Sequence, residues 1–188
     1  MENSQEKVAY EWIMAEAGKI NVVGEFYCST RDVFEVRFNQ MIKNLFEKRE
    51  EDASIVSAVV GEIANNSFDH NIGNWKDIPG IFFSYFFSED KVEIILADRG
   101  QGIFSTLKKV KSEIENDQEA LKVAFTERIS GRAPEKRGNG LKFVRENIKN
   151  KKMHLNFFSG TARAELNDQM KIEKNAENIE GCLAIITL

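Results

Sequence analysis

The 188-residue chain contains few of the residues that mark special classes of protein: two cysteines, two prolines, two histidines and twelve glycines. So little proline and glycine excludes collagen-like, linker-rich and low-complexity chains. Cys28 and Cys182 stand far apart in the sequence, so they cannot form a zinc framework. We expect both cysteines to be reduced, as is usual in the cytoplasm.

Long apolar runs are also missing. The longest such run, around residues 81–87, has the length of one strand, whereas a membrane-spanning helix needs about 20 apolar residues. The first seven residues are polar and partly acidic, which is not the pattern of a signal peptide. A net charge of −4 weighs against a dedicated nucleic-acid binder. We therefore expect a cytoplasmic protein that binds neither nucleic acid nor membranes.

The chain does have enough apolar residues, 42% with fourteen phenylalanines, for the core of a single domain. Residues 1–20 are predicted to be a helical extension, with a helix over Val8–Ala17, and residues 21–188 to be the main domain. The order of elements in that domain favours an α/β fold, a two-layer α/β sandwich with a mixed sheet.

Apolar spacing and turn residues predict the individual elements of the main domain. The expected strands are Asn21–Tyr27, Ile81–Phe87, Lys91–Ala97, Met153–Phe158, Thr161–Leu166 and Cys182–Leu188. The expected helices are Arg31–Lys48, Ser54–His70, Phe104–Glu115, Gln118–Ile129 and Leu141–Asn150, with loops over Ser130–Asn139 and Asn167–Glu180.

The first chemical motif lies on the helix that ends at His70. At 100° per residue, Glu62, Asn66 and Asp69 lie along one edge of this helix, beside its apolar face. An amide oxygen can bind a hard cation such as Mg²⁺, and a carboxylate one turn away can orient or deprotonate a water or hydroxyl. The alternative is an ordinary solvated helix surface.

The second motif, Asp98-Arg99-Gly100-Gln101-Gly102, directly follows an expected strand. A carboxylate at a strand end, beside glycine backbone that a ligand can approach closely, suits a planar base with an exocyclic amine. Glycine-rich turns after strands are common, however, so an ordinary turn is the alternative.

The third motif, Arg137-Gly138-Asn139-Gly140-Leu141, opens an expected helix. Backbone N–H groups at a helix N-terminus favour phosphate, and basic residues precede these glycines. The motif is neither a Walker A loop nor a dinucleotide fingerprint. By itself, a basic run of this kind is compatible with solvated surface.

Taken in order, the three motifs resemble the N, G1 and G2 boxes of the superfamily of gyrase B, heat-shock chaperone ATPases, histidine kinases and MutL, known as GHKL. The resemblance runs from about residue 21 to residue 188, and Gly181-Cys182 stands where the family has a Gly-Thr pair. It implies the Bergerat ATP-binding fold, with ATP and Mg²⁺ as ligands.

The resemblance also assigns roles to residues. Asn66 would bind the magnesium that bridges the phosphates, and Glu62 would orient or activate the attacking group. Asp98 would accept the adenine amine, and Gly102 would let the base lie against the backbone. The other nucleotide-binding positions that it implies are Asp69, His70, Gly100, Ile103, Arg137, Gly138, Asn139, Gly140 and Leu141. The segment Ile103–Asn139 would contain the ATP lid.

The length of the chain and the positions of its histidines narrow the choice among the branches of this superfamily. Gyrase-type and MutL-type enzymes need a following transducer domain, and we expect neither type here because the sequence ends where that domain would begin. The two histidines, His70 and His154, do not lie on a helical hairpin before the N box, as in ordinary histidine kinases. The layout is similar to that of the small anti-sigma-factor serine kinases.

This branch implies a regulatory switch that phosphorylates serine or threonine of a partner protein. The expected partners are ATP and an anti-anti-sigma-like or other regulatory protein, and a homodimer is one candidate assembly. A slow ATPase, or a nucleotide-gated binding module without phosphotransfer, is the alternative.

Overall fold

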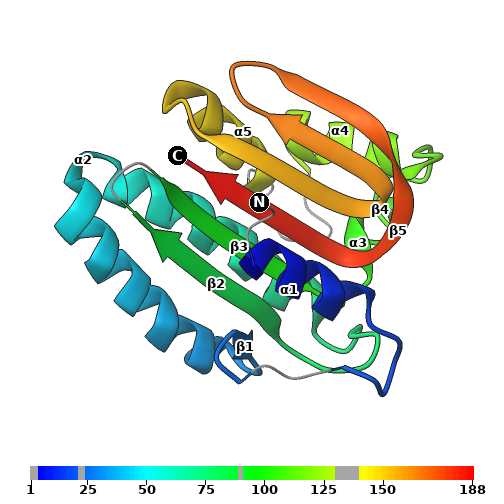
Figure 1. Ribbon diagram of the computed structural model, residues 1–188. Coiled ribbons are helices and arrows are strands. Elements are labelled where there is room, and N and C mark those ends of the chain that lie inside the picture. Colours follow the sequence, from blue (N-terminus) through cyan, green and yellow to red (C-terminus); the bar gives the residue numbers. More distant parts are fainter. Residues whose placement is uncertain (1–3, 21–23, 89–90, 130–139) are drawn as a thin grey trace.

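The framework of the molecule is a five-stranded sheet with the strand order β1-β2-β3-β5-β4 (Figure 1). The computed structural model describes residues 4–20, 24–88, 91–129 and 140–188, and this account is limited to them. The strands are β1 (Tyr27–Cys28), β2 (Ile81–Phe87), β3 (Val92–Asp98), β4 (His154–Leu166) and β5 (Met170–Thr187).

The predicted α/β sandwich is confirmed, but the predicted mixed sheet is wrong. Every neighbouring pair of strands in the described residues is antiparallel. The strands β3 and β4 run in the same direction, but β5 lies between them, so they do not pair with each other. The α/β class therefore comes with an antiparallel sheet.

Four helices cover one face of this sheet: α2 (Arg31–Asn71), α3 (Gly102–Lys108), α4 (Asp117–Thr126) and α5 (Gly140–Asn150). The helix α2 begins at the N-cap Thr30, whose side chain accepts a hydrogen bond from the N–H of Val33. It contains one residue with non-helical dihedral angles, Arg49. The two helices predicted over 31–48 and 54–70 are thus two halves of α2, joined at a kink.

The core between these helices and the sheet explains why α2 has its position. Val56, Val60 and Ile63 are buried on the second half of α2 and pack in the same cluster as Ile94 and Leu96 of β3. Because side chains alternate along a strand, residues 92, 94 and 96 of β3 face α2, and Asp98 continues this row. The end of β3 therefore places Asp98 beneath the second half of α2.

The C-terminal hairpin departs most from the sequence prediction. The strands predicted over 153–158 and 161–166 are one strand, β4, with register shifts around Gly160. The expected loop over 167–180 is mostly strand, because residues 170–174 and Ile179 pair with β4. Its charged residues lie on exposed positions of a strand, a pattern that resembles a solvated loop in sequence.

Smaller corrections concern element ends. The strand predicted over 21–27 is limited to β1 in the described residues, and residues 24–26 form a turn. The helix predicted over 104–115 ends at Lys108, whose ammonium donates to the carbonyls of Ser112 and Ile114. The N-terminal helix, α1, covers Ser4–Met14 rather than residues 8–17.

The helix α1 lies on the opposite face of the sheet from α2–α5 (Figure 1). Its buried residues Ala9, Trp12 and Ile13 join a second apolar cluster with Phe82, Ile95, Ala97, Ile179 and Leu183. The sheet is therefore covered in part on both faces. None of the helices within the described ranges is long and apolar enough to cross a membrane.

Candidate functional site

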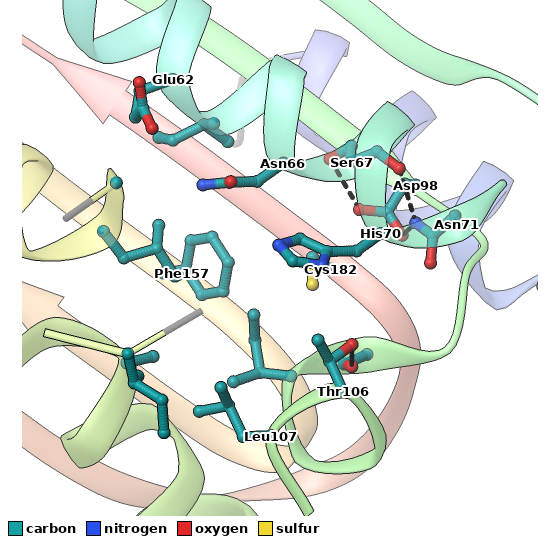
Figure 2. Close-up of a pocket in the computed structure, with 17 residues that line it drawn as sticks. Glu62, Asn66, Ser67, His70, Asn71, Asp98, Thr106, Leu107, Phe157 and Cys182 are labelled. Carbon is teal, nitrogen blue, oxygen red and sulfur yellow. Dashed lines mark hydrogen bonds between the residues drawn. The ribbon is translucent and has the colours of Figure 1, made fainter. Parts of the chain in front are cut away.

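A cavity lies between the second half of α2, the sheet and the helices α3 and α5 (Figure 2). Glu62, Asn66 and His70 are spaced by four residues, so one face of α2 presents all three to it. The neighbouring pair Ser67 and Asn71, also four residues apart, points toward the end of β3. Glu62 and Asn66 of the predicted polar edge thus line a cavity, and His70 rather than Asp69 lines it beside them.

The carboxylate of Asp98 closes one end of the cavity and is almost fully buried, with 1% of the residue exposed. It accepts hydrogen bonds from the Ser67 hydroxyl at 2.8 Å and from the Asn71 amide at 3.0 Å. The backbone N–H of Gly100 donates a third, at 3.0 Å. All three donors are neutral, and no ion pair joins the carboxylate to a basic side chain among the described residues.

Burial without a counter-charge changes the protonation of this group. Loss of hydration raises the pKa of Asp98 to about 6, and the hydrogen bonds from Ser67, Gly100 and Asn71 offset only part of that rise. Cys182 stands opposite Asp98 on β5, and burial, together with the Asp98 charge, raises the pKa of its thiol well above the ordinary value. Ionisation of Asp98 is thus unfavourable in the fold, and the carboxylate can accept further hydrogen bonds.

The loop after Asp98 is shaped by its glycines. A Cβ atom at Gly100 would collide with the side chain of Asn71, so the loop can approach α2 closely only with glycine there. Gly102 has a φ angle of 73°, in the left-handed region that favours glycine, and it begins α3. The next N–H, of Ile103, donates to the Ser159 hydroxyl at 3.0 Å. Gly102 and Ile103 both line the cavity.

The other end of the cavity is formed where α5 begins. A Cβ atom at Gly140 would lie 2.5 Å from Glu62 Oε1 and 3.0 Å from Asn66 Nδ2. The first residue of α5 therefore lies directly against the two predicted chemical residues of α2. The helix N-terminus, a carboxylate and an amide converge at this end.

Apolar side chains form the walls between the two ends. An apolar lining of this kind can enclose an apolar or aromatic group, while the polar ends determine its orientation. The apolar residues that line the cavity are Ile63, Ile103, Leu107, Ala124, Ile129, Leu141 and Phe157.

The other predicted site residues have different positions. Asp69 is not among the described residues that line the cavity, and its carboxylate accepts a hydrogen bond from Arg31. Gly100 lies behind the Asp98 carboxylate rather than on the cavity wall. Arg137, Gly138 and Asn139, together with the rest of residues 130–139 of the predicted lid segment, lie outside the described residues.

The sequence prediction did not include Ser67, Asn71, Thr106 or Phe157, which also line the cavity. For Ser67 and Asn71 a signal existed, because their spacing of four puts two hydrogen-bonding side chains next to the predicted polar edge. For Phe157 there was none, because it comes from β4 and reaches the cavity only through the strand order.

Within the described ranges, no group of three or more histidine, cysteine, aspartate or glutamate side chains is arranged to hold a metal ion. Glu62 and Asn66 therefore offer two oxygen ligands, which do not by themselves complete the coordination sphere of a metal ion. Such a pair suits Mg²⁺, which keeps several waters and is usually held by one or two protein groups together with substrate phosphates.

Comparison with known proteins gives a limited result. No protein-family model matches the chain, and no curated protein matches it in sequence. Among solved structures, the chain is similar to the one titled "Mycobacterial sensor histidine kinase MprB", with 15% sequence identity and a TM-score of 0.43. The alignment covers 82% of this chain and 93% of that chain.

Proposed function

We propose that this protein is a Mg-ATP-binding member of the GHKL superfamily that acts as a serine/threonine protein kinase-like regulatory switch on a partner protein. One observation carries the proposal. A buried, uncompensated carboxylate at one end of the cavity faces, across apolar walls, a carboxylate, an amide and a helix N-terminus at the other end.

The end at Asp98 suits adenine. The base has an exocyclic amine that can donate to Asp98, and its flat ring matches the apolar walls that include Ile103 and Leu107. Guanine carries a carbonyl oxygen at the corresponding position, which the carboxylate would repel. Asp98 therefore favours adenine over guanine.

The end at Gly140 suits the phosphates and their cation. Asn66 would bind Mg²⁺ through its amide oxygen, and the N-terminus of α5 would bind phosphate through its N–H groups. Magnesium would neutralise phosphate charge at this end. Glu62, next to the first residue of α5, is placed to accept a proton from a hydroxyl or a water.

Binding can be tested by calorimetry with Mg-ATP, Mg-GTP and ATP in EDTA. We expect ATP to bind more tightly than GTP, and binding to weaken without magnesium. Asn66→Ala should remove the magnesium dependence. Asp69→Asn is a matched control on the same helix, because Asp69 pairs with Arg31 instead of lining the cavity. If Asn66→Ala binds Mg-ATP as wild type does, the cation assignment is wrong.

Chemistry is tested with γ-labelled ATP, with and without the proteins encoded next to its gene. A kinase transfers label to serine or threonine of a partner, a slow ATPase releases phosphate, and a nucleotide-gated module does neither. Glu62→Ala should lower turnover by roughly 100-fold, the usual scale for a lost general base, and leave ATP affinity within a few-fold. An unchanged rate would mean that another group is the base.

A further inference from the structure

The residue after Asp98 has a different environment. Arg99 is also 1% exposed, but its side chain lies on the opposite side of the sheet from the cavity and reaches α1. Its backbone carbonyl accepts a hydrogen bond from the N–H of Lys76 at 3.0 Å. Two consecutive residues at the end of β3 therefore have their side chains on opposite faces of the sheet.

The guanidinium of Arg99 binds the C-terminal end of α1. It donates to the carbonyls of Trp12 at 2.8 Å, Ile13 at 2.6 Å and Ala15 at 2.7 Å. Carbonyls at a helix C-terminus lack partners within the helix and carry partial negative charge, so a cation there is favourable. The guanidinium also lies 5.8 Å from the ring centre of Trp12.

Asp77 fixes the same guanidinium from the other side, with Nη2 of Arg99 2.6 Å from its carboxylate and Nε 3.0 Å away. The hydrogen bonds from Arg99 lower the pKa of Asp77, so the pair is charged at neutral pH. Arg99 is therefore held by three backbone carbonyls and one carboxylate, and its position depends on α1 being in place.

The rest of the contact between α1 and the sheet is imperfect. Trp12 and Ala9 pack against apolar residues of the sheet, but Trp12 Nε1 and Gln5 Oε1 are buried and lack hydrogen-bond partners within the described residues. Each unpaired polar atom opposes docking, because it loses its hydrogen bonds to water and gains none. Arg99 thus supplies polar contacts that add to the apolar packing of α1 on the sheet.

We propose that Arg99 is a positioning residue that couples the docking of α1 on one face of the sheet to nucleotide binding at Asp98 on the other. Docked α1 fixes Arg99, and Arg99 fixes the backbone that carries Asp98 and Gly100. Coupling between two sites is reciprocal, so a bound nucleotide stabilises docked α1 by the same factor. This inference depends on the proposed nucleotide site.

The test is hydrogen exchange of the backbone amides of α1 in the full chain, with and without Mg-ADP or a non-hydrolysable Mg-ATP analogue. In the wild type, nucleotide should slow exchange over residues 8–14 by roughly 5-fold to 10-fold, within the usual range of coupling. Arg99→Met should abolish this protection and weaken nucleotide affinity by a similar factor. As a control, Arg163→Met removes an arginine on β4 whose guanidinium also makes several side-chain hydrogen bonds. It should change neither the protection of α1 nor the nucleotide affinity.

Two further variants separate coupling from a loss of folding. Arg99→Lys keeps the charge but cannot reach three carbonyls and a carboxylate together, so it should retain a part of the protection. Ala9→Asp puts a charge into the apolar interface of α1 without removing a hydrogen-bond partner of Arg99, and it should free α1 while weakening nucleotide affinity as Arg99→Met does.

The outcomes are distinguishable. If calorimetry detects no adenine nucleotide on the wild type, the proposed function and this inference both fail. If nucleotide binds but exchange over α1 is unchanged, only the coupling is wrong. The coupling is equally wrong if Ala9→Asp frees α1 and nucleotide affinity stays at the wild-type value.

Discussion

Two neighbouring residues, Asp98 and Arg99, are both charged and both almost completely buried, yet their surroundings differ. Arg99 faces a carboxylate and the negative end of a helix, so each of its donors has a partner of complementary charge. Within the described residues, the hydrogen-bond donors to Asp98 are neutral: Ser67, Asn71, Gly100 and the backbone of Cys182.

The difference teaches how to separate a structural charge from a functional one. Burying a charge costs several kcal/mol unless it is paired, so a compensated ion such as Arg99 stabilises the fold that contains it. An uncompensated carboxylate at the end of a cavity opposes folding at neutral pH. Its presence there is understandable if a ligand supplies the missing donor.

The largest expected effect comes from removing Arg99, the buried charge that is compensated. Arg99→Met would leave the Asp77 carboxylate and three carbonyls without a partner, and we expect a loss of about 3–5 kcal/mol in the free energy of unfolding. Urea titration at neutral pH measures it. Arg163, which is about one third exposed, gives the control: Arg163→Met should cost less than about 1 kcal/mol.

The next effect concerns Asp98, the uncompensated charge, and it changes the free energy of unfolding in the opposite direction. Asp98→Asn should raise the free energy of unfolding at pH 7.5, by at most about 3 kcal/mol, because the pKa rises from 3.8 to about 6 in the fold. The amide oxygen can still accept from Asn71 and Gly100. The same change should weaken ATP binding by roughly 10-fold to 100-fold. A variant that is destabilised and binds ATP normally would contradict both expectations.

The pH dependence of stability sharpens the comparison. The native state holds the Asp98 proton up to about pH 6 and the unfolded state only to about 3.8, so the contribution of Asp98 to stability falls as pH rises between these values. The pKa of Asp77 is lowered below 3.8, so its contribution is present above that pH and is lost on acidification. Difference curves of wild type against Asp98→Asn and Asp77→Asn should therefore have opposite slopes.

The smallest effect concerns the orientation of the carboxylate. Asn71→Ala removes one neutral donor from Asp98 and should move the pKa of Asp98 further upward, with a several-fold loss of ATP affinity at pH 6.5 and a smaller loss at pH 8. Gly100→Ala should act in the same direction, because its Cβ collides with the Asn71 side chain. NMR titration of the Asp98 carboxyl in the absence of nucleotide measures the shift directly. An unchanged titration would exclude Asn71 as a positioning residue.

Part of the site could be predicted because it depends on local spacing. Glu62, Asn66 and His70 share a face in any helix through residues 54–70, and Asp98 ends any strand built from the apolar run before it. Asn71 has the same helical spacing from Ser67, but its importance follows from contact with the loop at Gly100, which a single helix does not reveal.

Other features could not be predicted because their causes lie far along the chain. Residues 170–179 belong to a strand because β4 pairs with residues 170–174 and Ile179, although the charged composition of this segment is typical of a loop. Arg99 meets α1 more than 80 residues away in sequence, and no local pattern connects the two. The mixed sheet was wrong for a similar reason, since β5 lies between two strands that precede it in the chain.

The amino-acid sequence by itself determined the α/β class, the helical face with Glu62 and Asn66, and the carboxylate at the end of β3, because periodicity and strand ends are local properties. Only the tertiary structure decided that Asp98 is buried without a counter-charge while Arg99 is buried with one. Burial and charge compensation depend on which side chains the other elements bring into contact, and these contacts exist only once the sheet is assembled between α1 and α2.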